Sequence, residues 1–257
     1  MIKVKDLCKS FNDHHVLKSV NLEIKTGETI VILGRSGVGK SVLLRQIMGI
    51  EKADSGSIEI EGVNISALKG PALFRAVNEV GMLFQASALF DSMTVEENTA
   101  FYHSQHPDPR EGRILSKAEI HERVQGALAM VGLEGTEELM PSDLSGGMRK
   151  RAALARLIVY HPKVLLYDEP TTGLDPITAM SINDLIVKTQ RELNATSIVV
   201  THDICSTFRV ADRIAVIHDG EIIYFTTKKE FLTIKDPLVQ TFLKNSIPEG
   251  VVNERQI

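Results

Sequence analysis

Apolar and polar residues alternate over the first 25 residues, beginning with Ile2 and Val4. This two-residue period predicts β-strands with one buried face. The stretch TIVILG, residues 29–34, is different because it is apolar without interruption until its glycine. Such a run is typical of a parallel strand that is buried on both faces. The chain therefore begins with two kinds of β structure.

Strands and helices then alternate along much of the chain. A helix with a periodic apolar face follows the buried strand and ends at Gly49, and a long helix is expected over residues 176–193. Further strands are expected at residues 56–62, 80–85, 163–169, 196–202, 213–218 and 221–225. This alternation predicts an α/β fold with a mostly parallel sheet covered by helices.

The middle of the chain, residues 86–161, has no convincing strand pattern. Residues 103–113 are polar, contain two prolines and suggest a surface loop or the tip of a lobe. Ser116 and Glu119 have the spacing of a capping box, and the helix that they begin should end at Gly132. We therefore expect a helical lobe inserted into the α/β part. This gives a single domain, 1–257, with a core of residues 1–85 and 162–225, the lobe 86–161 and a C-terminal helical tail 226–257.

Composition narrows the function only a little. The chain has 257 residues, of which 43% are hydrophobic and 24% charged, and its net charge of −4 gives no sign of nucleic-acid binding. Its two cysteines, Cys8 and Cys205, are far apart and lack metal-site spacing, so reduced thiols are expected. No window has the apolar length of a membrane span, and the N-terminus lacks a signal-peptide core. We expect a cytoplasmic protein that needs a partner for any role in a membrane.

A glycine-rich loop supplies the clearest chemistry. GRSGVGKS fits the pattern G-x-x-x-x-G-K-[ST] and lies between a buried strand and a helix, as this motif requires. Backbone amides of the loop would surround the phosphates of a nucleotide, Lys40 would reach its β- and γ-phosphates, and the Ser41 hydroxyl would bind Mg²⁺. The candidate ATP-binding loop consists of Gly34, Arg35, Ser36, Gly37, Val38, Gly39, Lys40 and Ser41.

Two carboxylates follow another apolar strand, in VLLYDEP. Ligands of open α/β sheets bind beyond the carboxyl ends of the strands, so Asp168 and Glu169 should point into the crevice that holds the glycine-rich loop. Asp168 is a partner for Mg²⁺, and Glu169 is placed to polarise a water aimed at the γ-phosphate. The pair therefore favours a hydrolase over a passive nucleotide binder.

A second pair of glycines stands before a strong helix in LSGGMRKRAALARL, residues 144–157. A helix start with exposed amides is an anion site, yet this one belongs to the lobe. We expect it to act on a nucleotide held by a second copy of the chain, in a two-fold dimer that encloses two nucleotides. The residues concerned are Leu144, Ser145, Gly146, Gly147 and Met148.

Together these motifs resemble the ATP-binding-cassette (ABC) ATPase family over residues 2–225. The resemblance implies a P-loop NTPase core of the RecA-like type, with an N-terminal antiparallel β subdomain and an inserted helical subdomain. Phe11 then stands where an aromatic residue stacks on adenine, although tyrosine is commoner there. Leu174 and Asp175 form the D-loop, and residues 144–148 are the signature. Gln85 is the Q-loop residue, which binds Mg²⁺ or orients the attacking water, and His202 is the switch histidine at the γ-phosphate.

Within that family the chain is most similar to the ATPases of Mce/Mla-type phospholipid transporters. Met148 replaces the glutamine that commonly ends the signature, and ALFDSMTVEEN lies in the part of the lobe that meets the permease in ABC systems. The resemblance implies two ATPase copies beneath two permease subunits on the cytoplasmic face of a Gram-negative inner membrane. It also implies an Mce-type lipid-binding protein and, in some members, a STAS-domain partner.

Two other functions remain possible on the sequence. One is the ATPase of another ABC importer, for amino acids or ions, which would share the ATP chemistry. The other is a soluble ABC protein acting on DNA or the ribosome. A single cassette without heptads or a basic patch argues against this second alternative.

Overall fold

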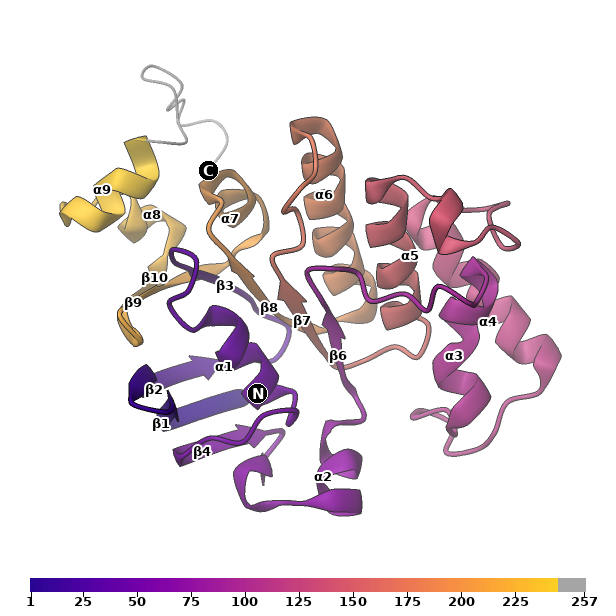
Figure 1. The fold of residues 1–257 in the computed structure, drawn as a ribbon, viewed down its shortest axis with the longest axis horizontal. Coiled ribbons are helices and arrows are strands. Elements are labelled where there is room, and N and C mark those ends of the chain that lie inside the picture. The colour runs from indigo at the N-terminus through magenta and orange to yellow at the C-terminus, as the bar shows by residue number, and fades with distance from the viewer. Residues whose placement is uncertain (245–257) are drawn as a thin grey trace. The chain divides into compact units, whose positions relative to one another are not determined.

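The computed structural model describes residues 1–244. Two compact units are present: one combines residues 1–76 with the chain from residue 196 onward, and the other comprises residues 77–195. Figure 1 labels their helices and strands. Residues 245–257, the end of the predicted helical tail, lie outside the described residues.

A four-stranded antiparallel sheet occupies the N-terminal part of the first unit, as the alternating pattern predicts. Its order is β2-β1-β4-β5, and Ile2 pairs with Ile24 on one side and with Ile60 on the other. These three side chains are buried, and Val4 of β1 is buried with them, so alternate residues at this end of the paired strands contribute to a core. The strands are β1 (Ile2–Phe11), β2 (His14–Ile24), β4 (Ser55–Ile60) and β5 (Val63–Asn64).

The first unit also holds the strand predicted from TIVILG. This strand, β3, lies between β8 and β9 and runs parallel to both, while β10 pairs with β9 in the antiparallel sense. All five residues of β3 are buried, which agrees with its uninterrupted apolar sequence. The strands are β3 (Thr29–Leu33), β8 (Thr196–Thr201), β9 (Arg213–His218) and β10 (Glu221–Thr227).

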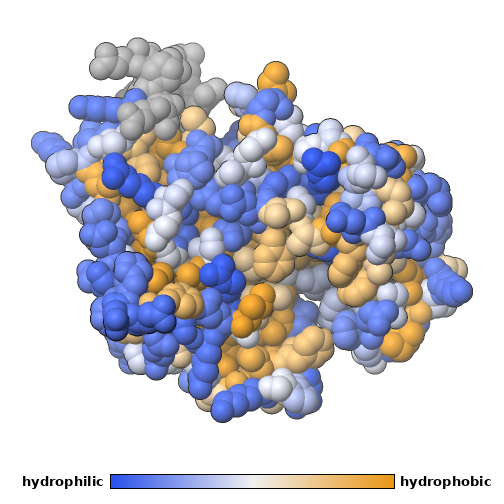
Figure 2. All heavy atoms as spheres, in the orientation of Figure 1, coloured by the Kyte–Doolittle hydropathy of each residue, from blue (hydrophilic) through white to orange (hydrophobic). Residues whose placement is uncertain are grey.

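Short helices accompany these strands. Helix α1 buries Leu43, Leu44 and Ile47 and contacts β8, and helix α7 contacts β3. The helices with residues in this unit are α1 (Lys40–Ile47), α2 (Gly70–Val77), α7 (Ile204–Val210), α8 (Lys228–Phe231) and α9 (Pro237–Lys244). In Figure 2, apolar residues gather where Figure 1 places α2, and Phe74 of that helix is 52% exposed. Polar residues prevail elsewhere on that face, without a wide apolar band.

The second unit contains two parallel strands and the four longest of the described helices. α5 contacts α3, α4, α6 and β6, so it lies at the centre of this unit. A side chain on Gly81 of β6 would approach the Leu157 side chain to 2.1 Å, so the glycine permits close packing of α5 on the strand. The elements are β6 (Val80–Leu83), β7 (Val164–Asp168), α3 (Val95–Gln105), α4 (Lys117–Val131), α5 (Gly146–Ile158) and α6 (Pro176–Leu193).

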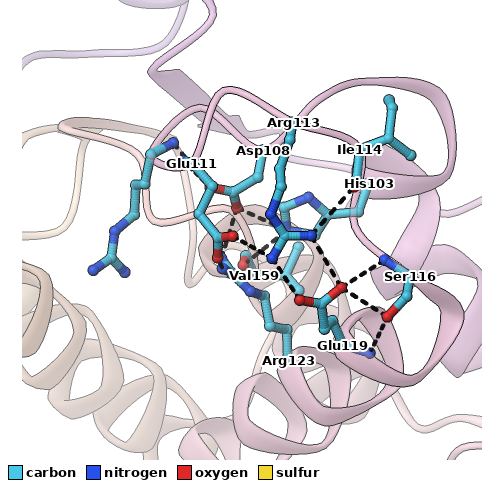
Figure 3. A network of polar contacts seen from close by, with 10 residues as sticks. His103, Asp108, Glu111, Arg113, Ile114, Ser116, Glu119, Arg123 and Val159 are labelled. Carbon is cyan, nitrogen blue, oxygen red and sulfur yellow. Dashed lines mark hydrogen bonds and ion pairs between the residues drawn. The ribbon is translucent and has the colours of Figure 1, made fainter.

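The polar segment around residues 103–113 is more tightly held than its composition suggests. Asp108 is completely buried and accepts hydrogen bonds from the backbone amides of Arg110 and Glu111 at 2.9 and 2.8 Å. Arg123 of α4 donates to the same carboxylate at 2.6 Å, and buried His103 of α3 lies beside it at 3.8 Å (Figure 3). A network of charges therefore fastens this segment to the helices of the lobe.

The structure confirms the predicted α/β class, with an antiparallel N-terminal sheet and a mixed, mostly parallel sheet. The capping box of Ser116 and Glu119 is present, and α6 has the predicted bounds. The strand expected at residues 80–85 ends at Leu83 instead, because residues 84–87 form a turn in which the Ser87 amide donates to the Phe84 carbonyl at 3.0 Å. Within residues 1–244, no helix has the length and apolar character needed to cross a bilayer.

Candidate functional site

The glycine-rich loop connects β3 to α1 in the first unit, in the predicted strand-loop-helix setting. Gly37 and Gly39 have φ angles of 83° and 101°, which are costly for other residues. A Cβ on Gly39 would lie 2.9 Å from the carbonyl oxygen of Val16 in β2, and one on Gly34 would lie 2.7 Å from that of Ile217 in β9. Gly37 and Gly39 therefore allow the backbone conformation of the loop, and Gly34 and Gly39 allow the loop to lie close to the neighbouring strands.

Lys40 begins α1 and is 5% exposed. Its ammonium group donates to the carbonyl oxygens of Gly34 and Arg35 at 2.8 and 2.9 Å. The charge thus lies within the curve of the loop, beside backbone amides at a helix start. This is the arrangement that favours binding of a phosphate group.

Two other predicted residues lie in the same unit as the loop. Leu33 pairs with Thr201, and the amide of Gly34 donates to the Thr201 carbonyl at 3.2 Å, so His202 follows β8 where the loop leaves β3. Phe11 ends β1, pairs with His14 of β2 and exposes 44% of its surface. Its ring is available for stacking, with the Lys9 ammonium 5.2 Å from its centroid.

The predicted carboxylates end β7 in the second unit. Asp168 and Glu169 are each 7% exposed, and both interact electrostatically with the Lys150 ammonium. Burial lowers the pKa of Lys150, while the two carboxylates act in the opposite direction. Lys150 also donates to the backbone carbonyl of Gln85, so Gln85 and the two carboxylates share one neighbouring cation.

Lys150 was not among the residues predicted for the site. A lysine two residues after Met148 looks like a solvated charge, but it is 5% exposed on the buried face of α5. Lys150 precedes Leu154 by four residues, so the two side chains lie on the same face of the helix. This place among apolar residues was the signal in the sequence that could have indicated its burial.

The second glycine pair begins α5, as predicted. Ser145 is the N-cap, and its hydroxyl accepts a hydrogen bond from the amide of Met148 at 3.2 Å. A Cβ on Gly147 would lie 2.7 Å from the Thr178 side chain of α6, so this glycine allows α5 and α6 to meet closely. Gly146 is exposed and has no such neighbour: its nearest heavy atom would be 3.7 Å away, on Leu174.

The predicted D-loop adjoins this helix start within the second unit. Asp175 is the N-cap of α6 and accepts hydrogen bonds from the amides of Ile177 and Thr178, both at 3.0 Å. These bonds, with that of the Thr178 side chain, hold the pKa of Asp175 below its usual value. The predicted signature and the predicted D-loop are therefore two adjacent capped helix starts.

Comparison with known proteins agrees with this geometry. A family profile described as "ABC transporter" matches residues 17–172, and the chain belongs to this family. It is an ABC ATPase. A dimeric ATP-binding cassette, MJ0796, solved in a post-hydrolysis state bound to ADP and Pi, superimposes with a TM-score of 0.80 at 32% identity. The match covers 88% of this chain and 98% of that one.

Three curated relatives represent different transport systems. The probable ribonucleotide transport ATP-binding protein Mkl of Mycobacterium leprae is 38% identical over 94% of this chain and 68% of its own length. The intermembrane phospholipid transport system ATP-binding protein MlaF of Haemophilus influenzae is 38% identical, over 95% and 90%. The sulfate/thiosulfate import ATP-binding protein CysA 2 of Shewanella oneidensis is 42% identical, over 95% and 67%. The chain thus spans about two thirds of the length of two of them.

Proposed function

We propose that the chain is the ATP-hydrolysing subunit of a transporter that moves phospholipid between membranes. The observation that carries the ATP chemistry is the phosphate loop with Lys40 folded inside its curve, in a chain that also has the buried acidic pair. In this proposal Phe11 stacks on adenine, and the loop from Gly34 to Ser41 holds the phosphates. His202 contacts the γ-phosphate.

Hydrolysis in this proposal depends on Glu169. Its carboxylate accepts the proton of a water as that water attacks the γ-phosphate, and Gln85 orients the water. The Ser41 hydroxyl, the Asp168 carboxylate and the Gln85 amide oxygen are oxygen donors of the kind that Mg²⁺ prefers. Mg²⁺ bound there would neutralise charge on the phosphates.

The signature of one chain acts on the nucleotide of a second copy. The support is a helix start with an exposed glycine, Gly146, capped by Ser145, together with the dimeric state of the similar cassette MJ0796. Closing of the dimer would add the signature residues 144–148 to each bound ATP. Hydrolysis would then release the two copies, which is how ATP could drive a membrane partner.

The proposed partner is an integral-membrane permease, with the ATPase bound peripherally on the cytoplasmic face. Similarity to MlaF supports a phospholipid substrate, and so does the signature ending in Met148. Phe90, in the lobe segment expected to meet the permease, is 40% exposed and gives that surface an apolar contact. An Mce-type lipid-binding protein and a STAS-domain protein complete the proposed assembly.

The second candidate is the ATPase of a different importer. The 42% identity to CysA 2 favours it, because the ATP chemistry is common to both and only the permease and cargo differ. Purification of the chain from membranes, with protein and lipid analysis of what accompanies it, separates the two. A permease with an Mce-type protein and bound phospholipid supports the proposal. A permease with a soluble-solute receptor and no lipid favours the second candidate, and absence of any integral-membrane protein contradicts both.

A further inference from the structure

The end of β1 that carries Phe11 extends past its neighbour on one edge. β1 lies between β2 and β4 in the antiparallel sheet (Figure 1), and its pairing with β4 ends at Cys8 and Ser55. Its pairing with β2 continues three residues further, to Phe11 and His14. The ring proposed to stack on adenine therefore lies where the strand has already passed the start of β4.

The side chain of Asp54 takes up the edge of β1 just before β4 begins. Its Oδ2 accepts a hydrogen bond from the Ser10 amide at 2.6 Å, and its own amide donates to the Cys8 carbonyl at 3.0 Å. The Ser10 amide and then the Lys9 ammonium hold the pKa of this carboxyl below its usual value, so it is charged at neutral pH. The end of β1 is thereby fastened to the residue that precedes β4.

Lys9 connects this carboxylate to the aromatic ring. Its ammonium group donates to Asp54 Oδ1 at 3.1 Å and to the Lys52 carbonyl at 2.9 Å. The same ammonium lies 5.2 Å from the centroid of the Phe11 ring, a distance at which a cation is attracted to an aromatic face. The Lys9 side chain is only 15% exposed, whereas much of the Phe11 ring remains open.

These contacts form a connected set, which an ordinary surface ion pair does not. An exposed pair alone contributes little, because solvent screens it and both side chains must be ordered. Here Asp54 also binds a backbone amide and Lys9 also binds a backbone carbonyl, so the cation over the ring is itself fixed. A side chain that is held in its bound orientation beforehand loses less freedom when a ligand arrives.

We infer that Lys9 and Asp54 are positioning residues that hold the Phe11 ring ready for stacking, and that they thereby set the affinity for the base of the nucleotide separately from the affinity for its phosphates. This rests on the proposed function, in which Phe11 stacks on adenine. Both residues act through Phe11, and neither contacts the phosphates.

The kinetic test compares a ligand that has a base with one that has none, in the complex purified from membranes. Lys9→Met and Asp54→Ala should each raise KM for ATP about fivefold and change kcat less than about twofold, because only the orientation of the ring is lost. The inhibition constant of inorganic tripolyphosphate, which binds through phosphates alone, should also change less than about twofold. Lys9→Arg keeps a cation over the ring and should restore most of the affinity for ATP.

Lys3→Met is the matched control, because it makes the same change on the same strand. Lys3 pairs with Glu23 of β2 at 3.7 Å, and it lies at the opposite end of β1 from Phe11. Its loss should leave both constants unchanged. An unchanged KM in Lys9→Met and Asp54→Ala, or an equal rise in the constant for tripolyphosphate, overturns the inference.

The orientation of the ring can be followed directly because the chain contains no tryptophan. Phe11→Trp in the purified full-length chain places its one indole at this position, and ATP should quench its emission while tripolyphosphate should not. Before any nucleotide is added, Lys9→Met should lower the anisotropy of this indole, since the ring is no longer held. Equal anisotropy with and without the lysine contradicts the positioning role.

Asp54→Asn covers the case in which Asp54→Ala does not fold. It keeps the shape of the side chain and one acceptor, removes the charge that anchors Lys9, and should raise KM for ATP in the same direction. Phe11→Ala separates the inference from the proposed function. Unchanged KM in Phe11→Ala would refute the stacking role of Phe11, whereas a raised KM there with normal values in the Lys9 and Asp54 variants would refute the positioning role alone.

Discussion

The hydroxyl group of Thr172 donates a hydrogen bond to Oε2 of Glu169 at 3.2 Å. Glu169 itself has a φ angle of 47°, and its carbonyl accepts from the amide of Thr172 at 3.3 Å. A glutamate in the left-handed region is held there by its surroundings. The turn after β7 therefore fixes the direction of this carboxylate, as its proposed role of general base requires.

Glu169→Gln should leave ATP binding intact and lower turnover by at least about a hundredfold, because the amide keeps the shape of the side chain but does not accept the proton. ATP binding would be measured by calorimetry and turnover by phosphate release. Glu122→Gln makes the same change on an exposed face of α4 and should retain full turnover. Normal turnover of Glu169→Gln would exclude this glutamate as the base.

Lys40→Ala should weaken ATP binding by about tenfold or more, since the loop loses the cation that faces the phosphates. The variant also leaves the carbonyls of Gly34 and Arg35 without this donor, so its melting temperature must be measured beside its affinity. Lys25→Ala removes an exposed lysine of the same unit and serves as the control. A folded Lys40→Ala protein with unchanged affinity would show that the loop does not hold the phosphates through this lysine.

Ser145→Arg should abolish hydrolysis while each monomer still binds ATP. The serine also caps α5, so its replacement costs about 1 kcal/mol of helix stability in addition. Ser116→Ala removes the equivalent cap of α4 and should lower the melting temperature similarly without reducing hydrolysis. If the two variants lose activity equally, the effect comes from helix stability and the signature has no separate role.

Stability of the lobe should fall with acid in two stages. Burial lowers the pKa of His103, so the unfolded chain binds its proton first and stability decreases as the pH falls below about 6.5. Burial acts to raise the pKa of Asp108, but the amides of Glu111 and Arg110 and the Arg123 guanidinium outweigh it. Because the net pKa of Asp108 is lowered in the folded lobe, the stability of the lobe decreases further as the pH falls through the acidic range.

His103→Gln should reduce the first stage to the part that comes from His161, because burial also lowers the pKa of His161. Glutamine does not titrate, and it still donates to the Val159 carbonyl that His103 Nε2 contacts at 3.2 Å. Urea unfolding between pH 7 and 5, followed by circular dichroism, measures this. If the free energy of unfolding of this variant falls with pH as steeply as that of the unmodified protein, the pH dependence comes from other groups.

Much of the fold could be predicted from local patterns in the sequence. TIVILG is apolar throughout because β3 pairs on both edges and is covered on both faces, and Ser116 with Glu119 makes a capping box that needs no distant contact. The glycine-rich loop was recognisable for the same reason, since its spacing is set by the chain's own turn around a phosphate. Features that leave a pattern in neighbouring residues are the ones a sequence displays.

Features that depend on distant residues were missed. Lys150 is buried because the carbonyl of Gln85, 65 residues earlier, accepts its hydrogen bond. Asp108 looked like part of a solvated loop, yet Arg123 of another helix allows its complete burial. α3 was not predicted because its polar sequence has little helical periodicity, and its Thr94–Glu97 capping box went unused.

In the proposed mechanism a second copy completes each ATP site, and the oligomeric state of Glu169→Gln decides whether it does. Light scattering after size-exclusion chromatography would be recorded with and without Mg-ATP, beside the double variant Glu169→Gln/Ser145→Arg. We predict an ATP-dependent dimer for the single variant and a monomer that still binds ATP for the double variant. Equal dimer formation by both proteins would contradict a composite site at the signature.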